Sequence, residues 1–347
     1  MHFDYQPLQQ PVTFGDATAY GRQKTPGSKA GFWFGIIFGA LFLVALLVVW
    51  IVANGGDAIR QSTLMPIVYV GLCAFLVFLL MVIPSYLYSV KAYALELHVK
   101  RFADANGIGF YSGPIDTPSN GIIFNKGWRR TYNVRLGFAN QNVSEIGNIE
   151  FTIGSGKSQE TYHYSYARLK LPRKLPHILL DSRKNDGFLG LKKIPFLELE
   201  NNQKMQLEGD FNDYFTLYVP AGYEQDALYV FTPDVMQLMV DTGARFDAEI
   251  VDDDLYIFQP KHIEFRDGTQ IEEIMTLAEK MHPEFASQVA RYADERVASP
   301  ELNTIDPKGQ RLENLPAVRL RFLIPFVIIL GVCAAILVFS IIWTLFS

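Results

Sequence analysis

Three long apolar runs mark this chain and leave a polar body between the second run and the third. They cover residues 31–53, 65–90 and 322–346, and none of them contains Asp, Glu, Lys, Arg or His. A helix of about 20 apolar residues crosses the roughly 30 Å hydrocarbon core of a bilayer. The pattern therefore predicts three transmembrane helices, of which the first two form a helical hairpin over 31–90.

The segments that flank these runs differ in composition. Pro84 predicts a kink or an end of the regular second helix, and apolar residues at helical spacing then predict a juxtamembrane helix over 91–107. Residues 1–30 are rich in Pro, Gln and Gly, which predicts a disordered N-terminal tail. Several prolines over 299–321 predict a tether between the body and the last span.

The body over 108–298 begins with short runs that alternate apolar and polar residues and are rich in Val, Ile, Tyr, Phe and Thr. This alternation predicts antiparallel strands. From Ile194 on, strands and helices mix, and Thr232–Asp234 supplies the cap, the proline and the acid of a helix start. Ala248–Val251 and Leu255–Phe258 are expected to form a hairpin that turns at Asp252–Asp254.

Lysine and arginine near the spans predict the orientation, because they concentrate on the cytoplasmic side. The loop between the first two spans holds only Arg60. The opposite side holds Arg22, Lys24, Lys29, Lys91, Lys100, Arg101, Lys308, Arg311, Arg319 and Arg321. The N-terminus and the body are therefore expected in the cytoplasm and the C-terminus outside, in a multi-pass protein of a bacterial inner (plasma) membrane. The predicted fold class is α+β: three transmembrane helices plus a cytoplasmic body with an antiparallel sheet and packed helices.

Charge and cysteine content narrow the function. A net charge of −5 is not typical of a nucleic-acid-binding protein. The two cysteines, Cys73 and Cys333, both fall in apolar runs, so the sequence predicts neither a disulfide framework nor a zinc site. Spans without ionisable groups are typical of anchors, whereas transport usually requires such groups at membrane depth.

Motifs that could carry chemistry have simpler explanations. Gly154–Ser158 resembles the end of a phosphate loop, but Phe151 stands where the first glycine is needed, so a hairpin turn is predicted. Asp252–Asp254 lacks the alternate spacing of a calcium loop and is predicted to be a solvated turn. The histidines show no i, i+4 metal pair, and no serine elbow occurs. We predict no catalytic, cofactor-binding or metal-binding residue, although a site built from distant residues stays open.

Glycines in the first span are candidates for helix packing. Gly31, Gly35 and Gly39 are four residues apart, so they share a helix face that another helix can approach closely. The functional interpretation is a packing or dimerisation face. The alternative is the ordinary use of glycine in membrane helices.

A basic segment in the body is the second interaction candidate. Its central residues are Arg173, Lys174, Arg183 and Lys184. They predict contact with the anionic inner leaflet or with an acidic partner. The alternative is a solvated face of alternating strands.

The residues Leu207–Phe215, Asp226–Pro233 and Leu255–Ile257, with Met236, resemble the bacterial membrane family catalogued as domain of unknown function 3137. The resemblance rests on an acidic segment with spaced phenylalanines, a Thr-Pro helix start followed by Met, and a late Leu-Tyr-Ile strand. Phe231 replaces the leucine before Thr-Pro. The resemblance implies an inner-membrane protein of unknown biochemical function and supplies no catalytic residues.

These observations predict a membrane-anchored, non-enzymatic interaction or scaffold protein with a cytoplasmic α+β domain. The expected partners are the lipid bilayer and a protein partner or a second copy of the chain, with no nucleic acid and no cofactor. The alternative is a membrane-tethered enzyme or small-ligand sensor with a cleft in the cytoplasmic body. A transporter subunit that supplies scaffold helices is a third and weaker interpretation.

Overall fold

The computed structural model describes residues 3–25, 28–54, 58–115, 121–139, 142–185, 203–299 and 302–312. The chain divides into two compact units. The first unit comprises Met1–Ser112, Val134–Ala139 and Ile263–Glu272, and the second comprises Gly113–Asn133, Asn140–His262 and Glu273–Ser347. Each unit is described by itself.

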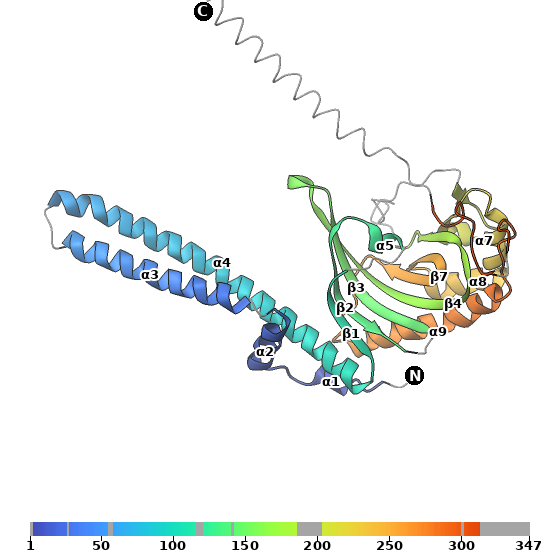
Figure 1. Cartoon of the computed structure of the whole chain (residues 1–347), viewed down its shortest axis with the longest axis horizontal. Helices are drawn as coiled ribbons and strands as arrows, with labels where there is room; N and C mark the ends of the chain where they lie inside the picture. Colours follow the sequence, from blue (N-terminus) through green and yellow to red (C-terminus); the bar gives the residue numbers. More distant parts are fainter. Residues whose placement is uncertain are drawn as a thin grey trace, which may run out of the picture. The chain divides into compact units, whose positions relative to one another are not determined.

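The first unit contains the helices α1 (Gln6–Gln9), α2 (Phe14–Lys24), α3 (Ser28–Asn54) and α4 (Ala58–Ala105) (Figure 1). Residues 1–30 were expected to be disordered, but α1 and α2 are helical and their residues Leu8 and Ala17 are buried. A capping box stabilises the start of α2: the Thr13 hydroxyl accepts from Asp16 N at 3.1 Å, and the Asp16 carboxylate accepts from Thr13 N. Composition alone does not reveal such a cap.

The helix α4 unites the second apolar run and the juxtamembrane segment, and Pro84 lies inside it without ending it. It ends at Ala105, and Gly107 then takes a φ of +65°, which glycine adopts without steric cost. Ion pairs tie α2 to this helix, with Lys24 Nζ 2.6 Å from Glu96 Oε2.

Among the described residues, one helical stretch, Tyr69–Ala105, is long and apolar enough to cross a membrane, and an 18-residue window within it has a mean hydropathy of 2.4. A shorter apolar stretch, Gly39–Val52, lies in α3. The expected third span over 322–346 lies outside the described residues. Three transmembrane helices were expected, and the described residues contain one candidate membrane helix. Together with the antiparallel sheet described next, the helices give an α+β fold.

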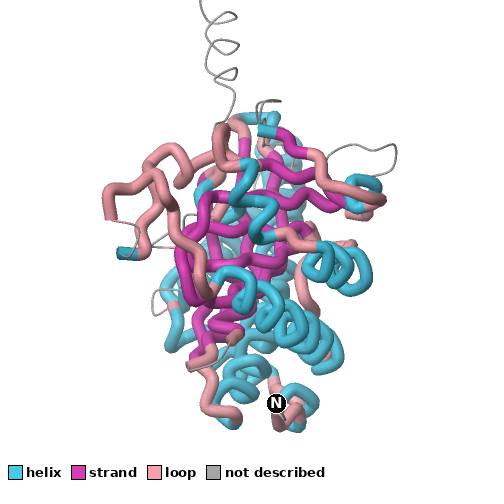
Figure 2. Tube along the Cα trace, turned by 90° about the vertical axis from the view of Figure 1, so that its right-hand side faces the viewer, coloured by secondary structure: helices cyan, strands magenta, loops and turns pink. Residues whose placement is uncertain are grey.

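Seven described strands form one twisted sheet (Figure 2). They are β1 (Gly109–Pro114), β2 (Trp128–Gly137), β3 (Val143–Ile153), β4 (Glu160–Ser182), β5 (Lys204–Met205), β6 (Phe215–Tyr218) and β7 (Asp247–Gln259). The order is β1-β2-β3-β4-β6-β5, and β7 pairs with β4. The β3–β4 connection is the predicted hairpin turn, in which Gly154 has a φ of +88° and a side chain would collide with the carbonyl of Ser158.

The predicted hairpin at Asp252–Asp254 is wrong, because β7 is a single strand that runs antiparallel to β4. Its register is irregular near Asp252, which has a φ of +55°. The acids face cations of β4: Asp253 Oδ1 is 2.8 Å from Lys170 Nζ, and Asp254 Oδ2 is 2.7 Å from Arg168 Nη2. In the sequence, three consecutive acids resemble a solvated turn, because the cations that face them across the strands lie far away along the chain.

Short helices connect the strands, and a long helix, α9, follows β7. They are α5 (Ile122–Asn125), α6 (Phe211–Tyr214), α7 (Glu224–Val230), α8 (Pro233–Leu238) and α9 (Gly268–Val289). In the second unit, α9 buries Met281 and Phe285, and the Phe285 ring meets the Phe231 ring edge-on at 6.0 Å. The helix α8 starts at Pro233 as predicted, but the expected cap is wrong, because the Thr232 hydroxyl makes no capping hydrogen bond.

Candidate binding site beside helix α7

A cavity of about 560 Å³ lies in the second unit between α7 and the segment that follows α9. We call this segment, residues 291–299 and 302–312, the strap. The helix α7 contributes Gln225, Asp226 and Tyr229 to the cavity wall. The strap contributes Arg291, Tyr292, Ala293, Glu295 and Arg296.

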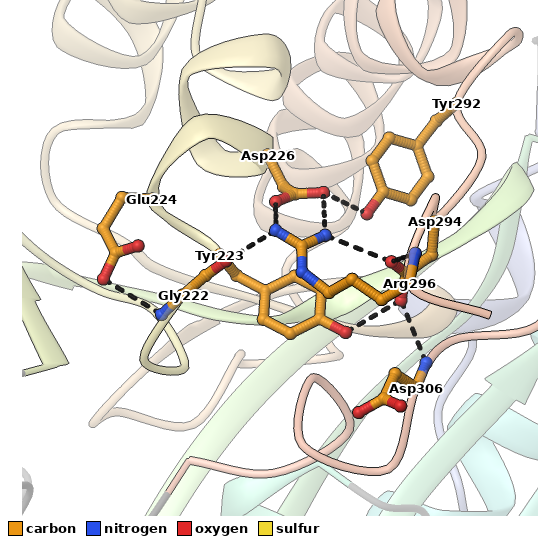
Figure 3. A network of polar contacts seen from close by, with 8 residues as sticks. All are labelled: Gly222, Tyr223, Glu224, Asp226, Tyr292, Asp294, Arg296 and Asp306. Atoms are coloured by element: carbon orange, nitrogen blue, oxygen red, sulfur yellow. Dashed lines mark hydrogen bonds and ion pairs between the residues drawn. The ribbon is translucent and has the colours of Figure 1, made fainter.

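Arg296 connects the strap to α7 (Figure 3). Its Nη2 lies 2.8 Å and its Nη1 3.2 Å from the two carboxylate oxygens of Asp226, which is a bidentate pair. Nη1 also donates to Asp294 Oδ1 at 3.1 Å, and Nη2 donates to the Gly222 carbonyl. The guanidinium carbon stands 4.0 Å from the centre of the Tyr223 ring. One side chain therefore joins four groups from two distant segments.

Asp294 is the buried centre of this network (Figure 3). Its Oδ2 accepts from the Tyr223 hydroxyl at 2.8 Å and from Asp306 N at 2.9 Å, and its Oδ1 accepts from Arg296 N at 3.1 Å. Burial alone would raise the pKa of Asp294, but the hydrogen bonds from Asp306, Tyr223 and Arg296 outweigh burial and lower it. The carboxylate is therefore held in its charged form.

The two tyrosines of the network act as hydrogen-bond donors. Tyr292 donates its hydroxyl to Asp226 Oδ1 at 2.6 Å, as Tyr223 donates to Asp294. Burial and these carboxylates raise the pKa of both tyrosines, so both hydroxyls keep their protons near neutral pH. Since both carboxylates already accept several hydrogen bonds, the arrangement is suited to holding two segments together rather than to proton transfer.

The strap is also bound to β4. Arg173 Nε donates to the Tyr292 carbonyl at 2.9 Å, Lys174 N donates to Asn303 Oδ1 at 2.9 Å, and His177 N donates to the Gly309 carbonyl at 2.8 Å. A side chain at Gly309 would collide with the Tyr223 ring. Residues 302–312, expected to be part of a tether over 299–321, are thus docked on the second unit, because backbone N–H groups of β4 donate to them, and no sequence pattern signals such donors.

Some groups on the cavity wall remain available. Arg291, Glu295 and Gln225 are exposed, and none of them forms a hydrogen bond or an ion pair with another described residue. Tyr229 is 42% exposed, and its ring centre lies 5.9 Å from that of Tyr292. The cavity therefore offers one cation, one anion, an amide and an aromatic face.

The glycines expected to form a packing face lie on α3 in the first unit. A β-carbon on Gly39 would lie 2.8 Å from Phe75 Cε2 of α4, and one on Gly35 would lie 3.7 Å from Phe78 Cζ. The two glycines line an apolar cavity of about 260 Å³ between α3 and α4. Gly31 is helical, but its surroundings lie outside the described part of the chain.

The four basic candidates have different environments. Arg173 and Lys174 are half-buried and bind the strap, and Lys174 Nζ also lies 3.9 Å from Asp252 Oδ1. Arg183 and Lys184 are exposed, and Lys184 Nζ is 5.1 Å from the centre of the Tyr214 ring. Two of the four candidates, Arg173 and Lys174, thus make contacts within the second unit.

A second buried polar cluster centres on Glu249 of β7. Its side chain is fully buried, and both oxygens accept from Ile122 N, at 3.0 and 2.8 Å. Its Oε1 is 2.6 Å from His177 Nε2. Burial lowers the pKa of Lys126, while the charge of Glu249 acts to raise it. Within the described residues, no group of three or more His, Cys, Asp or Glu side chains is arranged to hold a metal ion.

The sequence pattern predicted neither cluster. Asp226 and Arg296 are 70 positions apart, and His177 and Glu249 are 72 apart, so no local spacing signals them. The segment Asp226–Pro233, which carries part of the family resemblance, was the one signal near the cavity.

Asp294→Asn should lower the free energy of unfolding by about 2–3 kcal/mol at pH 7, because it removes a buried charge with three kinds of donor. The folded-state pKa of Asp294 is lowered, so its stabilisation is present above the ordinary value of about 3.9 and is lost as the pH falls through the lower folded value. The gap between the native chain and the variant should therefore be constant from about pH 7 to 5 and narrow below about pH 4.

The measurement is urea unfolding of the full chain in detergent, followed by near-ultraviolet circular dichroism. Glu284→Gln is the matched control, since Glu284 is an exposed acid of α9 whose side chain has no described partner, and it should change stability by less than about 0.5 kcal/mol. Equal stability of the two variants at pH 7 would contradict the structural role of Asp294.

No family model, no curated protein and no solved structure matches this chain.

Proposed function

We propose that this chain is a membrane-anchored, non-enzymatic interaction protein that binds a protein partner at the α7 cavity. The supporting observation is the contrast between the cavity wall and the network behind it. Arg291, Glu295 and Gln225 have no described partner, whereas Asp226 and Asp294 are saturated with hydrogen bonds. Arginine and tyrosine are enriched at the energetically important centres of protein interfaces. Neither nucleic acid nor a cofactor is part of this proposal.

The membrane arrangement is part of the same proposal. We infer that 31–53, 65–90 and 322–346 all cross the bilayer of a bacterial inner membrane, with the N-terminus and the body in the cytoplasm and the C-terminus outside. The distribution of lysine and arginine around the runs supports this orientation.

We also propose membership of the bacterial family catalogued as domain of unknown function 3137. The residues that carry the resemblance have evident packing roles: the rings of Phe211 and Phe215 stack at 5.0 Å, and Phe231 is buried. A member whose structure had a different strand order around these positions would contradict the assignment.

A photo-reactive amino acid at Gln225 tests the interaction surface in living cells. Illumination of the full chain should give a discrete protein adduct at Gln225, because this residue lines the cavity. The matched control is the exposed Lys157 in the β3–β4 turn, which should give none. Adducts should be read on denaturing gels and identified by mass spectrometry. Weak crosslinking of equal intensity at both positions, without a discrete adduct at Gln225, would contradict a binding role for the cavity.

Cysteine labelling tests the topology. In a background with Cys73 and Cys333 replaced by serine, single cysteines are placed at Ser347 and at the exposed Ser158. A membrane-impermeant maleimide should label position 347 in intact cells and position 158 only after permeabilisation. Equal labelling of both positions in intact cells would overturn the proposed orientation.

The Glu249 cluster favours the alternative of a tethered enzyme or small-ligand sensor. A buried carboxylate that orients a histidine, with a lysine nearby, is an arrangement found at catalytic sites. A panel of nucleotides, amino acids and sugar phosphates should then contain a compound that raises the Tm of the native chain. The Tm of His177→Gln should not respond, whereas that of His163→Gln, an exposed histidine, should respond normally. A panel without any Tm shift would count against this alternative.

A further inference from the structure

We propose that the α7 cavity is the contact between two copies of this chain, related by a two-fold axis. This inference rests on the proposed interaction function and names the partner. It starts from the two charged side chains of the cavity wall, Arg291 and Glu295, which are exposed and have no partner among the described residues.

The opposite signs of these two side chains make the surface self-complementary. An acidic partner would pair with Arg291 and oppose Glu295, and a basic partner would do the reverse. In a two-fold interface, each residue that contacts a second residue is contacted by that residue's copy in return. A second copy therefore supplies a carboxylate for Arg291 and a guanidinium for Glu295 at once, in two equivalent pairs.

The apolar groups fit the same arrangement. Leu228 on α7 is 50% exposed and precedes Tyr229, which forms part of the cavity wall. The exposed Leu228 and the exposed Tyr229 ring of one copy can therefore pack against the same two side chains of the other copy. Removal of this apolar surface from water favours the association.

The surface is already ordered before it binds. Arg296, Tyr292 and Asp226 hold the strap against α7, so the cavity wall loses little freedom on association. Two copies anchored in one bilayer would also meet at a raised effective concentration and with parallel orientation.

Charge exchange tests this contact directly. Full-length copies with two different affinity tags are expressed together, and their co-purification from native membranes is measured. Arg291→Glu and Glu295→Arg should each reduce co-purification with themselves about tenfold or more, since each places like charges opposite one another. The double variant Arg291→Glu/Glu295→Arg should recover it, because every pair is again of opposite sign.

The mixed experiment is the most stringent. A copy with Arg291→Glu should prefer a copy with Glu295→Arg over its own kind, and Lys157→Glu should change nothing. Recovery in the double variant and preference in the mixed pair support the contact. Co-purification that ignores these charges, or a native chain without self-association, overturns it. A Gln225 adduct with a different protein, without any self-adduct, also overturns it but leaves the proposed interaction function standing.

Discussion

The buried carboxylate of Asp294 determines where the strap lies. A charge without partners in a protein interior costs several kcal/mol, so the chain can bury Asp294 only where donors converge on it. Tyr223, Arg296 and the backbone of Asp306 meet this condition from three segments. Because Arg296 also pairs with Asp226, the strap and α7 are held at a fixed separation, and the cavity lies between them. The proposed binding surface is thus a consequence of one electrostatic requirement.

Sequence patterns predicted the structure correctly where it depends on residues that are close together along the chain. The β3–β4 turn around Gly154 follows from turn chemistry, and the start of α8 follows from the preference of proline for the first helical turn, so the positions of both were predictable. The single strand β7 was not, because Asp253 and Asp254 become strand residues only opposite Lys170 and Arg168. The cavity was not predictable either, since its two walls are separated by about 70 positions and meet only in the folded chain.

Charge that is segregated along the sequence is largely compensated in the fold. The basic residues of β4 and the acidic residues of β7 become cross-strand neighbours, and Arg168 Nη2 lies 2.7 Å from Asp254 Oδ2. The more exposed Lys170–Asp253 pair contributes about 1 kcal/mol or less, so the main effect of such a pair is on register rather than on total stability. A stretch of like charges in this sequence therefore marks a strand that pairs with an oppositely charged strand as much as it marks a charged surface. Arg183 and Lys184 are the exposed remainder of the basic candidates.

The unbroken helix α4 has a mechanical consequence. Its 48 residues make a rod of about 72 Å, and a bilayer core accounts for only about 30 Å of this length. Under the proposed crossing, roughly 40 Å of the same rod stands outside the hydrocarbon, where ion pairs from α2 brace it. A continuous helix carries rotation and tilt along its length, and Pro84, which lacks a backbone donor, is a point at which it can bend. Changes in bilayer thickness or in helix packing would therefore reach Phe102 and its aromatic neighbours as a movement of the outer part of α4 about Pro84.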